Sequence, residues 1–232
     1  MEPTVGVIEN TIDSIKQMLV DGELRPGDKL PVERDLAARL GVSRNTLREA
    51  VRALTTIRVL HARQGDGTYV TSLAPDLLLD SLGFVADLHH DAAVLQFLHV
   101  RRVLEPEATA LAANRLVPEQ LARLDELLVE SEQLIRSPEL DHQRLIANDH
   151  QFHSLIAGAC GNPVLAAIIE NLSGRTTRAR LWRGITDEGV VDRTIAEHRA
   201  IYTALAAGDP FRSRTYATTH VLGVEDWLRH AL

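Results

Sequence analysis

Residues 30–52 read LPVERDLAARLGVSRNTLREAVR, and this stretch decides the fold of the N-terminal third of the chain. Its apolar spacing predicts a short helix after Pro31 that stops at Gly41, followed by a second helix over 44–57. Ser43 is the expected N-cap, because its hydroxyl can accept a hydrogen bond from an unpaired backbone N–H. Two helices joined by a short turn that contains glycine form a helix-turn-helix.

The flanking segments extend this unit on both sides. Apolar residues at helical spacing predict a helix over 5–20. After the helix-turn-helix, residues 59–62 and 68–71 are expected as two short strands, with a glycine-rich hairpin tip over 63–67. A helix-turn-helix followed by a β-hairpin is a winged helix.

The rest of the chain predicts helices, and we find no convincing strand after residue 75. Asn162-Pro163 and Asp209-Pro210 each pair an N-cap residue with proline at the first helical position. The apolar periodicity recurs in seven blocks: 76–88, 91–115, 118–136, 139–159, 163–182, 190–207 and 210–231.

The expected fold class is therefore mainly α, with an N-terminal winged helix-turn-helix that carries a small β-hairpin and a C-terminal all-α antiparallel helical bundle. We place the DNA-binding-type domain at 1–72, a linker at 73–79 and the helical domain at 80–232.

Composition narrows the class of protein. Of the 232 residues, 45% are apolar and 25% charged, which is the balance of an ordinary globular protein. Cys160 is the only cysteine, which excludes a disulfide scaffold, and no apolar run approaches the roughly 20 residues of a membrane span. No signal peptide is visible at the N-terminus, so we expect a cytoplasmic protein without a membrane partner.

The charge is unevenly distributed. The net charge is −7, yet residues 34–63 hold seven arginines against Asp35 and Glu49. Such a basic segment suits a polyanion, although a solvated helix face would have the same charge.

The helix expected over 44–57 should have one buried face and one exposed face. Leu47, Ala50, Val51 and Leu54 are expected to pack inward, which leaves Arg44, Asn45, Thr46 and Arg48 on the outer face near the N-terminus. Arginine, asparagine and threonine all bind DNA, and the N-terminal end of the second helix of a helix-turn-helix meets the base edges.

Three motifs in this region resemble one family. LPVERDLA at 30–37, GVSRNTLREA at 41–50 and GDGTYV at 65–70 are similar to the winged helix of the GntR family of bacterial transcription regulators. The resemblance implies that operator DNA is met by Arg34, Ser43, Arg44, Asn45, Thr46 and Arg48, and that Gln64 and Gly65 at the wing tip reach toward the minor groove. Val32 replaces the commoner serine, which weakens a helix cap, and Arg58 stands where the family often has glycine.

Four side chains of the helical domain have metal-ligand chemistry. Asp149 and His153 are four residues apart, so they share a helix face, while His198 and His220 lie on apolar stripes. The stripe of His220 includes Tyr216, Val224 and Trp227. Facing helices of a bundle commonly build metal sites, and these ligands suit zinc first, with nickel, manganese or iron as alternatives. For the other histidines of the helical domain the sequence does not indicate a place among these ligands: His89, His90, His99, His142, His150 and His230.

Arg101 also lies on an apolar stripe and needs a partner if it is buried. One interpretation is a salt bridge to Glu105, four residues on. The other is a clamp for a carboxylate ligand, because the guanidinium fork matches that group.

The helical region resembles the FCD ligand-binding domain of the FadR-type branch of GntR regulators. The resemblance spans about 80–228 and rests on RRVLE at 101–105, the segment 149–153, GN at 161–162, EH at 197–198 and TH at 219–220. It implies that Asp149, His153, His198 and His220 are metal ligands and that Arg101 helps to bind an organic acid.

We therefore expect a homodimeric DNA-binding transcription regulator, a repressor, that binds a divalent metal ion and a small carboxylate effector. No catalytic residue is assigned. The alternative is a metal-dependent enzyme fused to a DNA-binding domain, and a third interpretation is an architectural DNA-binding protein with a structural helical domain.

Overall fold

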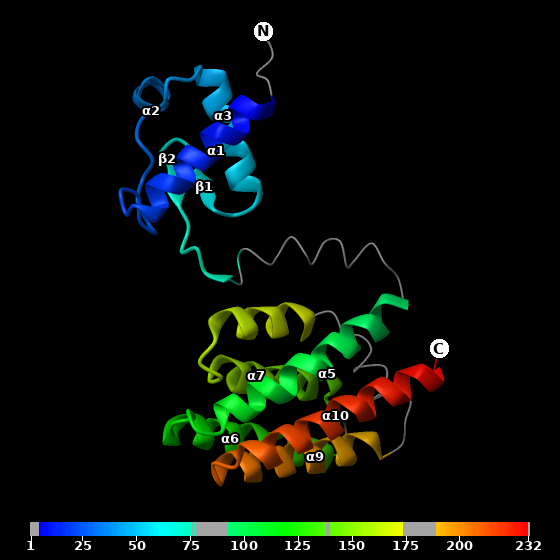
Figure 1. Ribbon diagram of the computed structural model, residues 1–232. Coiled ribbons are helices and arrows are strands. Elements are labelled where there is room, and N and C mark those ends of the chain that lie inside the picture. The colour runs from blue at the N-terminus through cyan, green and yellow to red at the C-terminus, as the bar shows by residue number, and fades with distance from the viewer. Residues whose placement is uncertain (1–4, 76, 78–91, 138–139, 174–188, 232) are drawn as a thin grey trace. The chain divides into compact units, whose positions relative to one another are not determined.

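The computed structural model describes residues 5–75, 77, 92–137, 140–173 and 189–231 (Figure 1). The chain divides into two compact units, Met1–Ser81 and Leu82–Leu232, and each is described by itself. Most of the helix expected over 76–88, His89, His90 and the second half of the block 163–182 lie outside the described residues.

The first unit contains three helices and a hairpin. They are α1 (Val5–Val20), α2 (Glu33–Leu40), α3 (Arg44–Thr56), β1 (Leu60–Arg63) and β2 (Gly67–Val70). Helix α3 packs against α1, α2 and β1, so it lies at the centre of the unit. The predicted winged helix-turn-helix is confirmed, with strand ends shifted by one residue.

Local chemistry explains the turn between α2 and α3. Gly41 ends α2 in the left-handed conformation, with φ of 67°, which glycine adopts without strain. Ser43 then caps α3, because its Oγ accepts a hydrogen bond from the Thr46 backbone N–H at 3.0 Å. Val32, by contrast, gives α2 no side-chain cap, as its apolar side chain requires.

The hairpin continues directly from this core. Strands β1 and β2 are antiparallel, with Leu60 opposite Val70, and both of these side chains are buried. Arg58, just before β1, has φ of 60°, a left-handed conformation that explains why glycine suits this position. The hydrophobic core beneath the hairpin includes Leu47 and Leu54 of α3.

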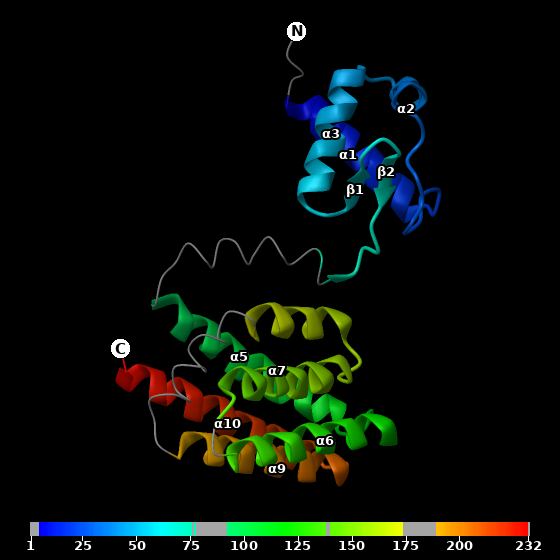
Figure 2. The ribbon, with the colours of Figure 1, turned by 180° about the vertical axis from the view of Figure 1, so that it is seen from behind.

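The described residues of the second unit form helices joined by turns and irregular segments, and they contain no strand. Its helices are α5 (Ala92–Ala112), α6 (Pro118–Ile135), α7 (His142–Gly158), the helical residues 163–173, α9 (Val190–Ala206) and α10 (Pro210–Ala231) (Figure 2). Both predicted caps are present: Asn162 Oδ1 accepts from the Val164 and Leu165 N–H groups, and Asp209 Oδ1 accepts from Arg212 N–H.

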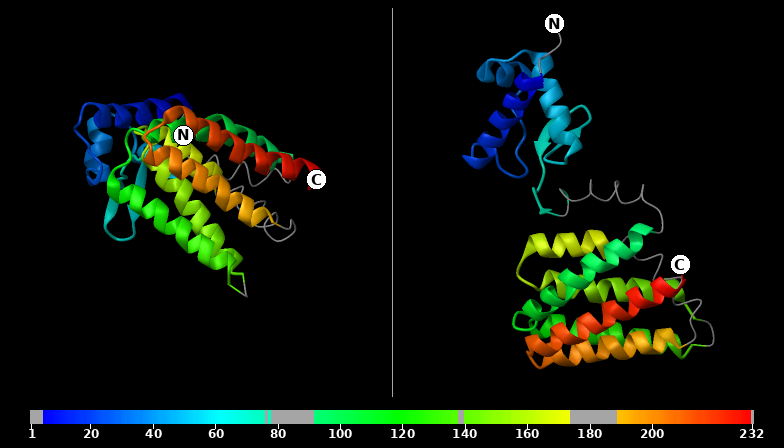
Figure 3. Two further views of the ribbon diagram at one scale, coloured as in Figure 1. Left: turned by 90° about the horizontal axis from the view of Figure 1, so that it is seen from below. Right: turned by 45° about the vertical axis from the view of Figure 1, so that its right-hand side comes forward.

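Five of these helices form a closed ring. Helix α5 packs against α10, α10 against α9, α9 against α6, α6 against α7, and α7 against α5 (Figure 3). Leu98 near the start of α5 contacts Leu228 near the end of α10, so these two helices are antiparallel. The largest apolar cluster of the unit lies inside the ring and includes Phe152 and Leu128. The predicted antiparallel bundle is confirmed, and its interior is where the candidate site lies.

None of the helices within the described residues combines the length and the apolar character needed to cross a membrane.

Candidate functional site

Four potential metal ligands from three helices come together inside the ring. Asp149 and His153 lie on α7, His198 on α9 and His220 on α10. Each offers one ligand atom, and these four atoms lie within 4.8 Å of one another. The four-residue spacing on α7 places its two ligands on one face, as the sequence indicates. Helix α7 faces α9 and α10 across the interior, so the cluster joins opposite sides of the ring.

The distances in the cluster match those between ligands of one ion. His198 Nε2 lies 3.2 Å from His153 Nε2 and 3.3 Å from His220 Nε2. Asp149 Oδ1 lies 3.6 Å from His198 Nε2 and 3.8 Å from His153 Nε2. Two ligands that each lie about 2.1 Å from a single ion are roughly 3 to 3.4 Å apart. The two shorter separations therefore fit a common ion without rearrangement.

The protons of the three imidazoles also favour a cation at the centre. His220 Nδ1 lies 2.8 Å from Glu197 Oε2, and donation of its proton to this carboxylate leaves a lone pair on His220 Nε2. His198 Nε2 has a neighbouring nitrogen on either side but can carry only one proton. His198 Nε2 therefore cannot donate a separate proton to each neighbour, whereas a cation at the centre would bind the lone pairs of all three Nε2 atoms.

The electrostatic surroundings keep His153 in the form that binds metal. Burial lowers the pKa of His153 well below its usual value, and His198, His220 and Arg101 act in the same direction while Asp149 opposes them. The neutral imidazole is consequently favoured, and neutral imidazole is the form that ligates metals. The His198 ring is held by Phe152, which stacks on it with ring centroids 4.7 Å apart.

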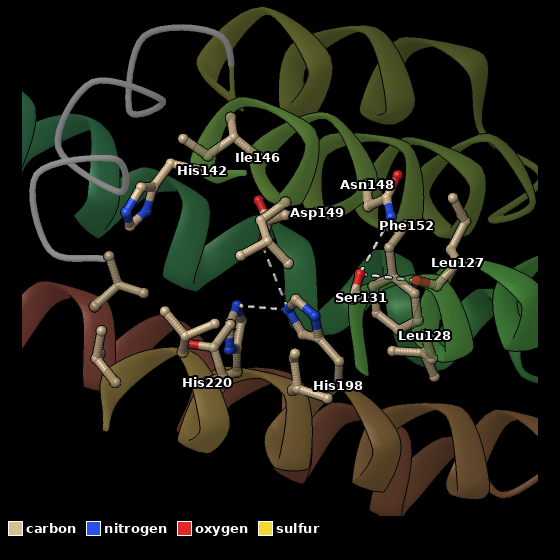
Figure 4. A pocket seen from close by; sticks show the side chains of 16 residues that line it. Leu127, Leu128, Ser131, His142, Ile146, Asn148, Asp149, Phe152, His198 and His220 are labelled. Carbon is tan, nitrogen blue, oxygen red and sulfur yellow. Dashed lines mark hydrogen bonds and ion pairs between the residues drawn. The ribbon is translucent and has the colours of Figure 1, made fainter. Parts of the chain in front are cut away.

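A cavity of about 90 Å³ adjoins the cluster. Asp149, His198 and His220 point toward it, and Figure 4 shows them at the centre of the lining. The remainder of the described lining is mainly apolar and includes residues of α6, α7, α9 and α10: Leu127, Leu128, Leu145, Ile146, Phe152, Val190, Val191, Ile195 and Val224. Four further polar residues line it: Ser131, His142, Asn148 and Thr194.

Four polar lining residues are not among those that the sequence predicts: Ser131, His142, Asn148 and Thr194. His142 is the first residue of α7, and Asn148 donates from Nδ2 to Ser131 Oγ at 3.3 Å. His142 lies one turn before Leu145 and Ile146 and two turns before Asp149, and these spacings are the signals that could have found it.

Arg101 is placed differently from the metal ligands. Its side chain is 2% exposed, its Nε donates to Glu105 Oε1, and it is not among the described residues that line the cavity. The salt bridge to Glu105 that the sequence leaves open is therefore present. The role of Arg101 in binding an effector stays a prediction.

One inward placement predicted around the cluster is wrong. Tyr216 is 39% exposed, whereas Val224 on the same helix is buried. A spacing of four residues turns a helix about 40° beyond a full turn, so Tyr216 lies at the outer margin of the stripe that contains His220.

The face of α3 that is predicted to contact DNA is largely exposed as expected, with one correction. Arg44, Asn45 and Arg48 are exposed. Thr46, which the sequence places on the outer face, is only 4% exposed, so that prediction is wrong. Its hydroxyl is turned toward the cap, 2.7 Å from Ser43 Oγ, because the capping interaction draws both side chains to the helix end.

Several predicted DNA-binding residues have ion-pair partners. Arg48 Nε donates to Glu33 Oε2 at 2.8 Å, and Arg34 Nε donates to Asp35 Oδ1 at 2.9 Å. All four side chains are at least 47% exposed. Each arginine can therefore leave its carboxylate partner and bind a DNA phosphate at little cost in free energy. Gln64 and Gly65 are exposed at the hairpin tip.

Two family models match the chain. The model described as "Bacterial regulatory proteins, gntR family" matches residues 8–70, and the model described as "FCD domain" matches residues 96–223. These two segments correspond to the hairpin-bearing unit and to the helical ring.

The relatives are transcription regulators. The chain is 32% identical to the HTH-type transcriptional regulator LutR of Bacillus subtilis over 217 residues, which cover 91% of this chain and 96% of LutR. It is 26% identical to the galactonate operon transcriptional repressor of Escherichia coli, over 94% of this chain and 95% of the repressor. The solved structure of Streptococcus agalactiae GntR is similar with a TM-score of 0.72 at 28% identity, covering 94% of this chain and 99% of that one.

Proposed function

The chain belongs to the GntR family of bacterial regulatory proteins and carries an FCD domain, and from that premise we propose a regulator whose FCD domain binds one divalent metal ion and a small carboxylate effector. The coarser part of this function, DNA-binding transcription regulation, follows from the family. The family and the relatives are regulators and not enzymes, so the metal is proposed as a binding group.

The convergence of three imidazole Nε2 atoms and one carboxylate is the observation that carries the proposed metal site. Asp149, His153, His198 and His220 would hold the ion, with zinc as the first candidate and nickel, manganese or iron as alternatives. A bound divalent ion would offer its remaining coordination positions to carboxylate oxygens. The residues fit this group because two Nε2–Nε2 separations already match inter-ligand distances and Asp149 Oδ1 lies 3.6 and 3.8 Å from two of these nitrogens.

The cavity supports a small acid with a mainly apolar body as the effector. Its carboxylate would face Asp149, His198 and His220 across the ion, and the body would lie against α6 and the start of α9. Each hydroxyl buried there needs a hydrogen-bond partner, and Asn148 and Thr194 are among the few polar side chains in the described lining. A polyhydroxylated acid would therefore leave several of its hydroxyls unpaired.

The winged helix would bind operator DNA as part of a homodimer. Arg44, Asn45 and Arg48 are exposed at the N-terminal end of α3, which in a helix-turn-helix enters the major groove. The two winged helices of a dimer would match the two halves of a palindromic operator. We propose the domain boundaries 1–72, 73–79 and 80–232 for this arrangement, and repression as the mode of regulation.

Effector binding would act on the helical ring as a whole. The ligands come from α7, α9 and α10. A change in the coordination of the ion would therefore shift three helices at once. A coupling free energy of only about 1 to 3 kcal/mol changes operator affinity roughly 5- to 150-fold.

The metal site is tested by titration of chelator-treated protein with Zn²⁺ in a calorimeter. Wild type is expected to bind one ion per chain, and His198→Ala to lose this binding. His230→Ala is the matched control, because His230 is an exposed histidine of α10 outside the cluster.

Measurements of DNA binding by the same proteins should show that the substitution affects only the helical domain. His198→Ala is expected to retain operator binding, since its winged helix is unchanged. Equal Zn²⁺ affinity of His198→Ala and wild type would show that the ligands are wrongly chosen, and the absence of binding by wild type would refute the site.

A further inference from the structure

Two carboxylates lie behind two of the imidazoles, on the side away from the ligand cluster. Glu197 Oε2 is 2.8 Å from His220 Nδ1, and Glu105 Oε2 is 3.8 Å from His153 Nδ1. In both rings Nε2 faces the cluster centre while Nδ1 faces an acid. A hydrogen bond from Nδ1 fixes the tautomer and the orientation of an imidazole ligand.

The first of these contacts is already a hydrogen bond, whereas the second is not. Glu105 is 5% exposed, and its Oε2 has no hydrogen-bond partner among the described residues. A buried carboxylate oxygen without a donor is costly. The His153 Nδ1 atom is the neighbouring group that could satisfy it, and the two atoms need to approach by less than about 1 Å to reach hydrogen-bond distance.

Arg101 fixes the position of this carboxylate. Its Nε donates to Glu105 Oε1, and both side chains are almost fully buried on α5. The guanidinium compensates the charge of the buried acid, which would otherwise be strongly destabilising. Because α5 packs against α7, the pair approaches His153 from outside the ligand cluster.

We propose that Arg101 and Glu105 form a positioning pair for the metal ligand His153, with Glu105 accepting the Nδ1–H of His153 and Arg101 holding Glu105 in place. Glu197 has the corresponding role for His220. Arg101 thus supports the metal through two intermediate groups, Glu105 and His153. This inference rests on the proposed metal site, and it predicts which outer groups determine metal affinity.

The test is a titration of chelator-treated protein with Co²⁺, followed by its visible absorption and by competition with a chelator. Glu105→Gln is expected to weaken Co²⁺ binding by roughly 10- to 100-fold, the usual effect of losing such a partner. Glu107→Gln is the matched control: it is the same substitution on α5, at a half-exposed residue paired with Arg214, and it should leave the affinity unchanged.

A second variant protects the test against misfolding. The double substitution Arg101→Gln and Glu105→Gln removes both charges together, so no uncompensated charge stays buried. It should retain a wild-type helical circular dichroism spectrum and bind Co²⁺ as weakly as Glu105→Gln. Imidazole ¹⁵N spectra of the Zn²⁺-loaded protein should show a slowly exchanging Nδ1 proton on His153 in wild type and its loss in Glu105→Gln, a change that a merely structural role would not produce.

The outcomes distinguish this inference from the proposed function. Co²⁺ affinity of folded Glu105→Gln and of the double variant within twofold of wild type would overturn the positioning pair and leave the metal site intact. Failure of wild type to bind Co²⁺ or Zn²⁺ would overturn both.

Discussion

The protonation of His153 links the stability of the helical unit to pH. The low pKa of folded His153 contrasts with the value near 6.5 of an unfolded histidine. Below about pH 6.5, His153 therefore binds a proton in the unfolded chain but not in the folded chain. Unfolding becomes easier as the pH falls, and the full contribution of His153 to stability is present only above that pH.

We predict that the free energy of unfolding of chelator-treated protein falls as the pH is lowered from 7.5 to 5.5. The contribution of His153 is at most about 1.4 kcal/mol per pH unit. Urea denaturation at each pH measures it. His153→Gln should show a shallower pH dependence, whereas His230→Gln, at an exposed site, should retain the wild-type slope. A steeper slope in His153→Gln would contradict the expected direction of this effect.

The arginines of α3 have a different role, because they are exposed and exchange partners easily. We predict that Arg44→Ala and Arg48→Ala each weaken operator binding with the fold intact. Loss of a base contact should cost about 1 to 3 kcal/mol for the specific site only, while loss of a phosphate contact should weaken all DNA and reduce the salt slope by about one.

Fluorescence anisotropy at several salt concentrations separates these two cases. Arg123→Ala, an exposed arginine of α6, is the control and should bind DNA like wild type. Wild-type affinity in both α3 variants would mean that another element reads the operator.

At the scale of elements, one carboxylate joins the hairpin tip to its surroundings. Asp66 accepts from Lys29 Nζ at 2.9 Å and from Tyr69 Oη at 2.6 Å, and these bonds lower its pKa. Arg63 lies over the Tyr69 ring, 4.3 Å from its centroid. The tip that carries Gln64 and Gly65 is thus tied to the segment before α2.

We predict that Asp66→Asn loosens the hairpin without unfolding the unit. Hydrogen exchange of the amides over 60–70 should become faster, while that of α3 stays unchanged. The matched control is Asp13→Asn, which removes an exposed ion pair of α1 with Lys16. Unchanged exchange in Asp66→Asn would show that strand pairing alone orders the tip.

The elements themselves could be predicted because their signals are local. Gly41, Ser43, Asn162 and Asp209 mark helix ends by interactions within four residues of themselves, and the apolar stripes decide which faces are buried. Thr46 could not be placed in this way, because its burial depends on the cap and not on the stripe.

The candidate site was predictable only in part, for the same physical reason. Its four ligands lie on apolar stripes, which periodicity detects. Glu105 and Glu197 reach their histidines from other helices, 48 and 23 residues away in sequence, and no local pattern encodes such a contact. The salt bridge between Arg101 and Glu105 is local and could be predicted from their spacing, whereas its place beside His153 is set by the packing of α5 against α7.

For the molecule as a whole, the cavity should select among effectors by polarity. We predict that metal-loaded protein binds butanoate more tightly than gluconate by about ten- to a hundredfold, because most of the hydroxyls of gluconate would lack partners among the few polar side chains of the described lining. Calorimetry measures this order. Leu128→Ala should weaken butanoate binding, and tighter binding of gluconate would refute an apolar body for the effector.

We also predict a homodimer. Sedimentation at micromolar concentration should give twice the chain mass of 25.6 kDa, and one dimer should bind one palindromic operator. A monomer both with and without operator would contradict this.

The spread of the ligands along the chain has one further consequence. His153 and His198 are 45 residues apart and His198 and His220 are 22 apart, so an ion that joins them closes two long loops of the polypeptide. Such a cross-link restricts the unfolded chain, much as a disulfide does, and the effect grows slowly with loop length. With Cys160 as its only cysteine, the chain has no intrachain disulfide available, and the metal ion would supply the missing cross-link between the two sides of the helical ring.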